Sequence, residues 1–161
     1  MQVSATYLDW PAFATLAGDN FEERYYAYLD PEEGEPTAAP GEVDIEASDD
    51  WSDSFIAFSD AAEYLDEHIE EDSPWRPFVD NAFLALIKSP KPRNDLGCPV
   101  NFELFASILS PSTVREIMQS SMGQPIPWSE APGEVEEEIG RWHSIWSKAV
   151  ERNLGIAYHI G

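Results

Sequence analysis

The stretch "EVEEEIGRWHSIWSKAVERN", Glu134 to Asn153, carries the longest regular pattern in the chain and decides the expected fold. Glutamates fill its first turn, whereas Lys148 and Arg152 lie in its last, as the helix dipole favours. Gly155 predicts the end of the helix, and "IAYHI" after it predicts a final short strand. The apolar residues recur with the 3.6-residue period of an amphipathic helix: Val135, Ile139, Trp142, Trp146, Ala149 and Val150.

Two further segments carry helix-start patterns. "SPSTVREIMQSSM" predicts a helix with Ser110 as its N-cap and Pro111 at the first helical position. The residues expected to point inward from this helix are Val114, Ile117 and Met118. At the N-terminus, "ATYLDWPAFATLAGD" predicts a short extended start and then a helix of roughly two turns from near Pro11 to Gly18.

An acidic helix is expected to begin at Asp60, because Asp60 and Glu63 have the spacing of a capping box. The segment just before it, "WSDSFIAFS", predicts a short strand with Phe55, Ile56 and Phe58 as its apolar part. "SP" at Ser73 and Pro74 predicts the end of the acidic helix and the start of another. The buried stripe of the acidic helix is expected to be Ala61, Leu65 and Ile69.

Together these elements predict an α+β fold, mainly helical, with a few short strands, a long C-terminal amphipathic helix and a terminal strand. The length of 161 residues favours a single domain over residues 1–161. Residues 30–50 are expected to form an acidic loop rich in Pro and Gly. Residues 20–30, "NFEERYYAYLD", and residues 102–109, "FELFASIL", fit either a helix or a strand.

The composition is globular, with 43% hydrophobic and 12% aromatic residues, but 31 acidic side chains against nine basic ones give a formal charge of −22. Such a surface is repelled by anionic lipid heads and by nucleic acid phosphate. We therefore expect neither a membrane nor direct nucleic acid as a partner. A single cysteine, Cys98, excludes an intramolecular disulfide, and the N-terminus lacks a leader pattern. These features predict a cytoplasmic protein.

The acidic residues are concentrated in one part of the chain. Tyr25 to Trp75 contains 17 of the 31 acids and no Lys or Arg. A surface that serves only solubility usually mixes both signs of charge, so this segment predicts a surface that meets a basic protein partner. The tryptophans Trp51 and Trp75 border the region and are expected to act as apolar anchors. The expected partner-binding residues are Asp49, Asp50, Trp51, Asp53, Glu63, Asp66, Glu67, Glu70, Glu71, Asp72 and Trp75.

Motifs for catalysis or cofactor binding do not occur: the chain has no nucleophile elbow, zinc-protease motif, P-loop or dinucleotide fingerprint. We therefore expect no enzyme activity and no cofactor, and the general character resembles that of bacterial immunity proteins, the cytoplasmic antidotes to toxins. That resemblance implies an inhibitor that covers a basic active-site surface of a toxin domain. The oligomeric state is left open.

Three alternatives remain from the sequence. The chain fits a nucleic-acid mimic that inhibits a DNA- or RNA-binding protein, as anti-restriction factors do. It also fits a metal-dependent enzyme that uses His68 with nearby acids, since His68 and Asp72 have i, i+4 ligand spacing. Finally, an acidic host proteome would give the same composition without any specific partner.

A second resemblance concerns the C-terminal third of the chain. "ILSPSTVREI", Ile108 to Ile117, followed by a long helix with "WSKAVERNLGIAYHI", is similar to the C-terminal half of the YfbM-like family of uncharacterised bacterial proteins. The resemblance implies an α+β fold. The family's central tryptophan–histidine segment is replaced here by "PWRPFVDNAFLALIKSP", so no functional residues are carried over.

Overall fold

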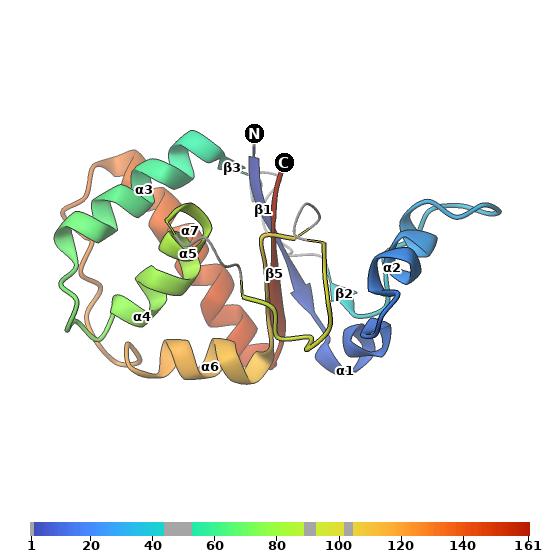
Figure 1. Cartoon of the computed structure of the whole chain (residues 1–161). Helices are drawn as coiled ribbons and strands as arrows, with labels where there is room; N and C mark the ends of the chain where they lie inside the picture. The colour runs from blue at the N-terminus through green and yellow to red at the C-terminus, as the bar shows by residue number, and fades with distance from the viewer. Residues whose placement is uncertain (1, 44–52, 89–92, 102–104) are drawn as a thin grey trace.

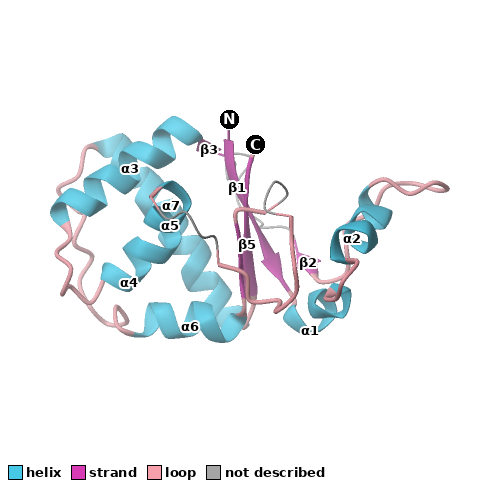
Figure 2. Cartoon of the chain, viewed as in Figure 1, coloured by secondary structure: helices cyan, strands magenta, loops and turns pink. Residues whose placement is uncertain are grey.

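The computed structural model describes residues 2–43, 53–88, 93–101 and 105–161. An antiparallel sheet separates two groups of helices (Figure 1 and Figure 2). The first and last strands pair along its centre, from Val3 opposite Ile160 to Leu8 opposite Gly155. The strand order is β2–β1–β5–β4, and β3 also pairs with β1. The strands are β1 (Gln2–Leu8), β2 (Glu42–Val43), β3 (Asp53–Ser54), β4 (Ser107–Leu109) and β5 (Gly155–Ile160).

One face of the sheet is covered by the larger group of helices (Figure 1). The acidic helix α3 (Phe55–His68) and the long helix α7 (Gly133–Arg152) lie against each other. Below them, α4 (Arg76–Val79) continues through a π-helical turn (Asp80–Leu84) into α5 (Ala85–Ile87). Helix α6 (Pro111–Gln119) packs on α7 and β5.

Helix α7 is fixed to the sheet by aromatic side chains whose polar atoms are all satisfied. Trp146 donates from Nε1 to the hydroxyl oxygen of Tyr158 at 2.6 Å, and Tyr7 donates from its hydroxyl to the Ile145 carbonyl at 3.1 Å. Trp142 stacks on Tyr158 with ring centroids 5.1 Å apart. Burial raises the pKa of the Tyr158 hydroxyl, so this group stays protonated at neutral pH.

The other face of the sheet carries a smaller core beneath α1 (Trp10–Phe13), the 3-10 turn Ala14–Leu16 and α2 (Phe21–Leu29). Leu8, Ile108 and Ala157 point to this side because side chains alternate along a strand. They meet a cluster of rings in which Phe21 and Tyr25 lie close to Phe105. Helix α2 and the loop after it extend away from the body (Figure 1).

The α+β architecture, the long C-terminal helix and the terminal strand are confirmed. Ser110 caps α6 as predicted, accepting a hydrogen bond from the Thr113 amide at 3.3 Å. The end of α7 differs from the expectation: Asn153 takes the left-handed conformation, with φ of 55°, and Gly155 already belongs to β5. Of residues 20–30, Phe21–Leu29 form the helix α2, and Tyr28 and Leu29 at its end are exposed.

The acidic helix begins five residues earlier than Asp60. Of the strand predicted from "WSDSFIAFS", only Asp53 and Ser54 form a strand among the described residues, and its expected apolar part, Phe55, Ile56 and Phe58, is helical. Ser54 is the true N-cap, since its side-chain oxygen accepts a hydrogen bond from the Ala57 amide at 3.1 Å. Asp53 and Ser54 form the short strand β3, and the helix starts directly after it. The helix ends at His68, so the acids that follow lie in a turn.

Candidate functional site

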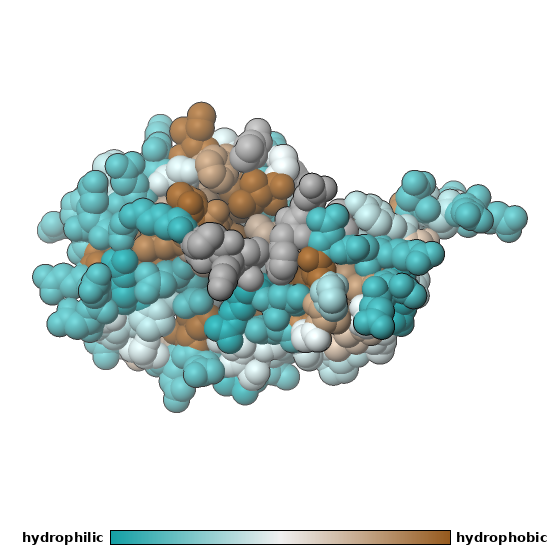
Figure 3. Space-filling view, in the orientation of Figure 1, coloured by the Kyte–Doolittle hydropathy of each residue, from teal (hydrophilic) through white to brown (hydrophobic). Residues whose placement is uncertain are grey.

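Five exposed carboxylates gather where α3 ends and the chain turns toward α4, a surface that we call the acidic end. Glu63 and Glu67 lie one turn apart on α3, and the others lie in the turn. No member forms an ion pair with another residue in the described ranges. Hydrophilic surface covers this side of the molecule (Figure 3). The acidic end consists of Glu63, Glu67, Glu70, Glu71 and Asp72.

Asp66 differs from these five because two cations neutralise it. Its carboxylate accepts hydrogen bonds from Lys88 and from Arg76, the latter at 2.8 Å, and Arg76 also bonds Asp80 at 2.9 Å. The Lys88 and Arg76 hydrogen bonds lower the pKa of Asp66. The expectation that the acidic segment lacks counter-ions is therefore wrong for Asp66, since its partners follow that segment in sequence. Asp66 ties α3 to the following helices.

Trp75 is buried and is no exposed anchor. It has 4% of its surface exposed and contacts Trp128, with ring centroids 4.9 Å apart. Its Nε1 donates to the Pro125 carbonyl at 3.0 Å. A side chain held in this way does not project from the protein surface toward a partner.

The acidic end, as the described residues define it, does not include the remaining predicted contacts. Asp49, Asp50 and Trp51 lie outside the described residues. Asp53 lies in β3, which pairs with the first residues of β1. The structure therefore brings together five of the eleven predicted residues as exposed, unneutralised charge.

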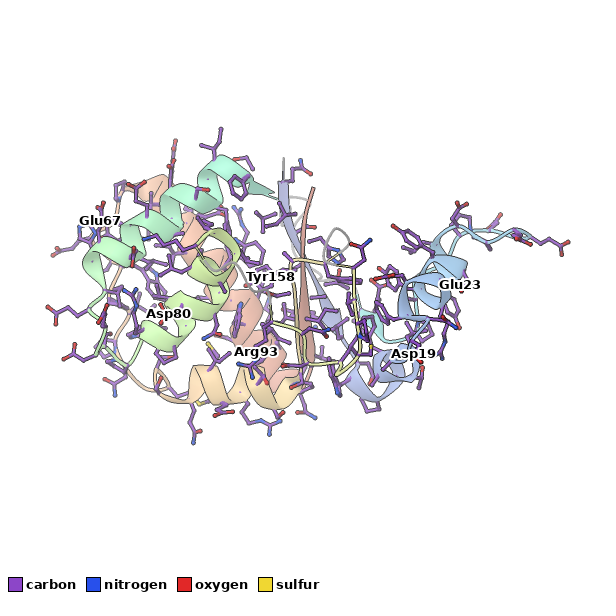
Figure 4. All side chains as sticks on the ribbon, in the orientation of Figure 1. Asp19, Glu23, Glu67, Asp80, Arg93 and Tyr158 are labelled. Carbon is purple, nitrogen blue, oxygen red and sulfur yellow. The ribbon has the colours of Figure 1, made fainter. Side chains whose placement is uncertain are left out.

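The described residues of the acidic segment do not form one continuous surface. Glu23, on α2 just before this segment, and Glu67, on α3 within it, lie at opposite ends of the molecule (Figure 4). The arm made by α2 and its following loop has its own acidic hollow, which includes the half-exposed ring of Tyr26. This second surface was missed because residues 20–30 fit either a helix or a strand from the sequence alone, so no exposed face could be assigned to them; Tyr26 has 45% of its surface exposed.

A pocket of about 300 Å³ lies beside Trp75, where the end of α6 and the loop after it meet α7. Met118 and Val150 line it with Trp75, and Met122 and Ile126 lie at its edge with 60% and 50% of their surfaces exposed. Residues far apart in sequence form this pocket, so no local pattern predicts it. The walls are mainly apolar, with Ser121 and Gln124 from the end of α6 and its loop and two further polar side chains from α7.

The polar side chains from α7 are His143 and Ser147, one helical turn apart. The Ser147 hydroxyl oxygen lies 3.5 Å from Nε2 of His143. The imidazole faces the rings of Trp75, Trp128 and Phe78 at centroid distances of 5.2, 5.4 and 5.6 Å. Burial among these rings lowers the pKa of His143, so the neutral imidazole is the form that lines the pocket at pH 7.

This lowered pKa predicts a pH-dependent contribution to stability. Below the ordinary histidine pKa of about 6.5, the unfolded chain binds a proton that the folded chain resists. Between pH 7 and pH 5, the wild type should therefore lose stability relative to His143→Phe. Urea unfolding of both proteins at the two pH values measures this difference, and parallel pH dependences would contradict it.

The hypothesis of a metal site at His68 receives no additional ligands from the described residues. His68 stacks on Tyr64, with ring centroids 4.0 Å apart, and its Nδ1 lies 2.9 Å from the Tyr64 carbonyl. Because a carbonyl only accepts, Nδ1 is the donor. Across the described ranges, no group of three or more His, Cys, Asp or Glu side chains is placed to hold a metal ion.

A comparison of the chain with models of protein families, with curated proteins and with solved structures finds no match. Within the described ranges, no helix has the length and apolar character needed to cross a bilayer. The function proposed below therefore depends on the surface of the protein itself.

Proposed function

We propose that this chain is an acidic binding protein of the immunity type, which neutralises a cognate bacterial toxin by covering a basic surface of the toxin with the acidic end. The observation that carries this proposal is the group of five exposed carboxylates without ion pairs among the described residues. Glu63 and Glu67 repel each other at i, i+4 spacing, which mildly destabilises the helix. A basic partner removes that repulsion.

Electrostatic attraction gives such a protein fast association. Complementary surfaces raise association rate constants to roughly 10⁸–10⁹ M⁻¹s⁻¹ at low salt, and like charges exclude wrong partners. The net charge of −22 adds a long-range field to this local surface. An antidote needs both properties, because a toxin has to be bound before it reaches its target.

An inhibitor of this kind accounts for the described surface better than a nucleic-acid mimic does. A mimic presents its carboxylates along an extended row like the phosphates of a strand. In the described part of the chain, the exposed carboxylates of the acidic segment fall into two groups at opposite ends of the molecule (Figure 4). A compact group suits a basic protein surface.

Replacing Glu63, Glu67, Glu70 and Glu71 by Gln should leave the fold intact, because all four side chains are exposed. The same change should slow association with the partner by about tenfold or more at low ionic strength. The partner is first captured on the immobilised wild-type chain and identified. Its association rate constant with each protein is then measured by surface plasmon resonance at two salt concentrations.

A matched control removes the same charge from the arm: Glu23, Glu32, Glu33 and Glu35, which are also exposed, are replaced by Gln. This control should bind the partner at nearly the wild-type rate. Equal association rate constants for the wild type and both variants would show that the acidic end does not contact the partner. A captured partner that does not inhibit bacterial growth when expressed alone would contradict the immunity function.

A further inference from the structure

The pocket beside Trp75 lies next to the acidic end, and two hydrogen bonds fix them together. Ser120, just after α6, donates from its hydroxyl to the Pro74 carbonyl at 2.7 Å. Trp75 donates to the Pro125 carbonyl on the loop that forms the opposite edge of the pocket. The turn with Glu70, Glu71 and Asp72 leads directly into Trp75. The acidic end and the apolar pocket therefore lie side by side on one surface.

The pocket has the properties of a site for an apolar side chain. Its volume of about 300 Å³ lies at the lower end of the range for ligand pockets. Met118 and Met122 are flexible and polarizable, and such side chains adapt to varied apolar groups. Met122 and Ile126 are large apolar residues exposed at the edge of the pocket.

Acidic side chains lie beside the pocket along the chain, and Arg76, the cation that directly follows Trp75, is already paired with Asp66 and Asp80. Glu70, Glu71 and Asp72 precede Trp75, and Glu151 lies one helical turn beyond Ser147 on the same side of α7. Lys148 points further round the helix. An apolar occupant with basic neighbours complements this arrangement, whereas an acidic occupant is repelled.

We propose that this pocket receives an apolar side chain, such as leucine or phenylalanine, from a basic amphipathic segment of the protein partner, whose Lys and Arg residues meet Glu70, Glu71 and Asp72. This inference rests on the proposed function, because it names the chemistry by which the acidic end holds its partner. The buried apolar side chain slows dissociation, while the surrounding charges speed association. His143 lines the pocket as a neutral imidazole, so it does not repel a basic segment.

The test uses two synthetic peptides with the same charge. The first, KLLKKLLKKLLKKL, is basic and amphipathic, and the second has alanine in place of every leucine. Met118 and Met122 are two of the three methionines of the chain. Selective methyl labelling of methionine therefore gives NMR signals that report on the pocket directly. We expect the leucine peptide to shift both signals and to bind at least tenfold more tightly than the alanine peptide.

Variants separate the pocket from the charge. The double variant Met122→Gln with Ile126→Gln, both at exposed positions, should bind the leucine peptide at least fivefold more weakly. Its affinity for the alanine peptide should be unchanged. The matched control, Leu29→Gln with Ile56→Gln, removes exposed apolar side chains far from the pocket and should have no effect. Replacing Glu70, Glu71 and Asp72 by their amides should weaken both peptides.

The outcomes distinguish this inference from the proposed function. Equal affinities for the two peptides, or binding without shifts of the two methionine signals, would overturn the proposal that the pocket receives an apolar side chain. The proposed function would still be supported if the Gln variants of the acidic end associate more slowly with the toxin. Methionine shifts that depend on protein concentration without peptide would show that a second copy occupies the pocket, which also overturns the proposal. Unchanged binding after amide substitution would overturn the assigned role of the acids.

Discussion

Trp146→Ala is expected to lower the free energy of unfolding by about 3–5 kcal/mol, the range for removing a large aromatic side chain from a packed core. Trp146 is completely buried, meets Phe78 edge-on at 5.9 Å and donates its Nε1 hydrogen to Tyr158. The substitution removes the contact between α7 and β5 and leaves the buried Tyr158 hydroxyl without this donor. Urea unfolding at pH 7, followed by circular dichroism, measures the loss.

A loss of this size approaches the whole stability of a typical domain, so a milder variant is measured beside the alanine variant. Trp146→Phe keeps an aromatic ring but removes Nε1, and its expected cost is about 1–3 kcal/mol for the hydroxyl left unsatisfied. Unfolding midpoints equal to the wild type for both variants would contradict the role given to Trp146 in holding α7 on the sheet.

Elements whose pattern is local were predicted well from the sequence. Helix α7 and strand β5 carry their own periodicity, and Ser110 with Pro111 defines the start of α6. Such patterns need no knowledge of tertiary contacts. The start of α3 was misplaced because two caps compete there: Asp60 and Glu63 have the expected spacing, but Ser54 makes the hydrogen bond.

The candidate site was predicted only in part, since burial depends on residues distant in sequence. Exposure of Glu63 and Glu67 followed from the apolar stripe of α3, which is a local property. The burial of Trp75 depends on Trp128 and Pro125, about 50 residues later in the chain. The neutralisation of Asp66 by Lys88 depends on the path of the chain through α4 and α5. Long-range contacts of this kind leave no periodic pattern.

Gly41→Ala is expected to have the second large effect, because this glycine combines an unusual conformation with a close backbone contact. Its φ is +83°, and a β-carbon here would lie 2.5 Å from the Phe13 nitrogen and 2.6 Å from the Asp9 carbonyl oxygen. The Gly41 carbonyl also accepts a hydrogen bond from the Asp9 amide at 2.7 Å. This contact joins the start of β2 to the chain around α1, beside the smaller core.

The strained conformation and the forced displacement of backbone together should cost about 2–5 kcal/mol. Gly34→Ala provides the matched control, since Gly34 has a φ of +93° but nothing within 4 Å of the added carbon. Its expected cost is only that of the conformation, about 1 kcal/mol. Both values come from urea unfolding. Equal costs for the two variants would show that the chain around Asp9 and Phe13 moves aside freely, and that the contact at Gly41 does not hold β2 against α1.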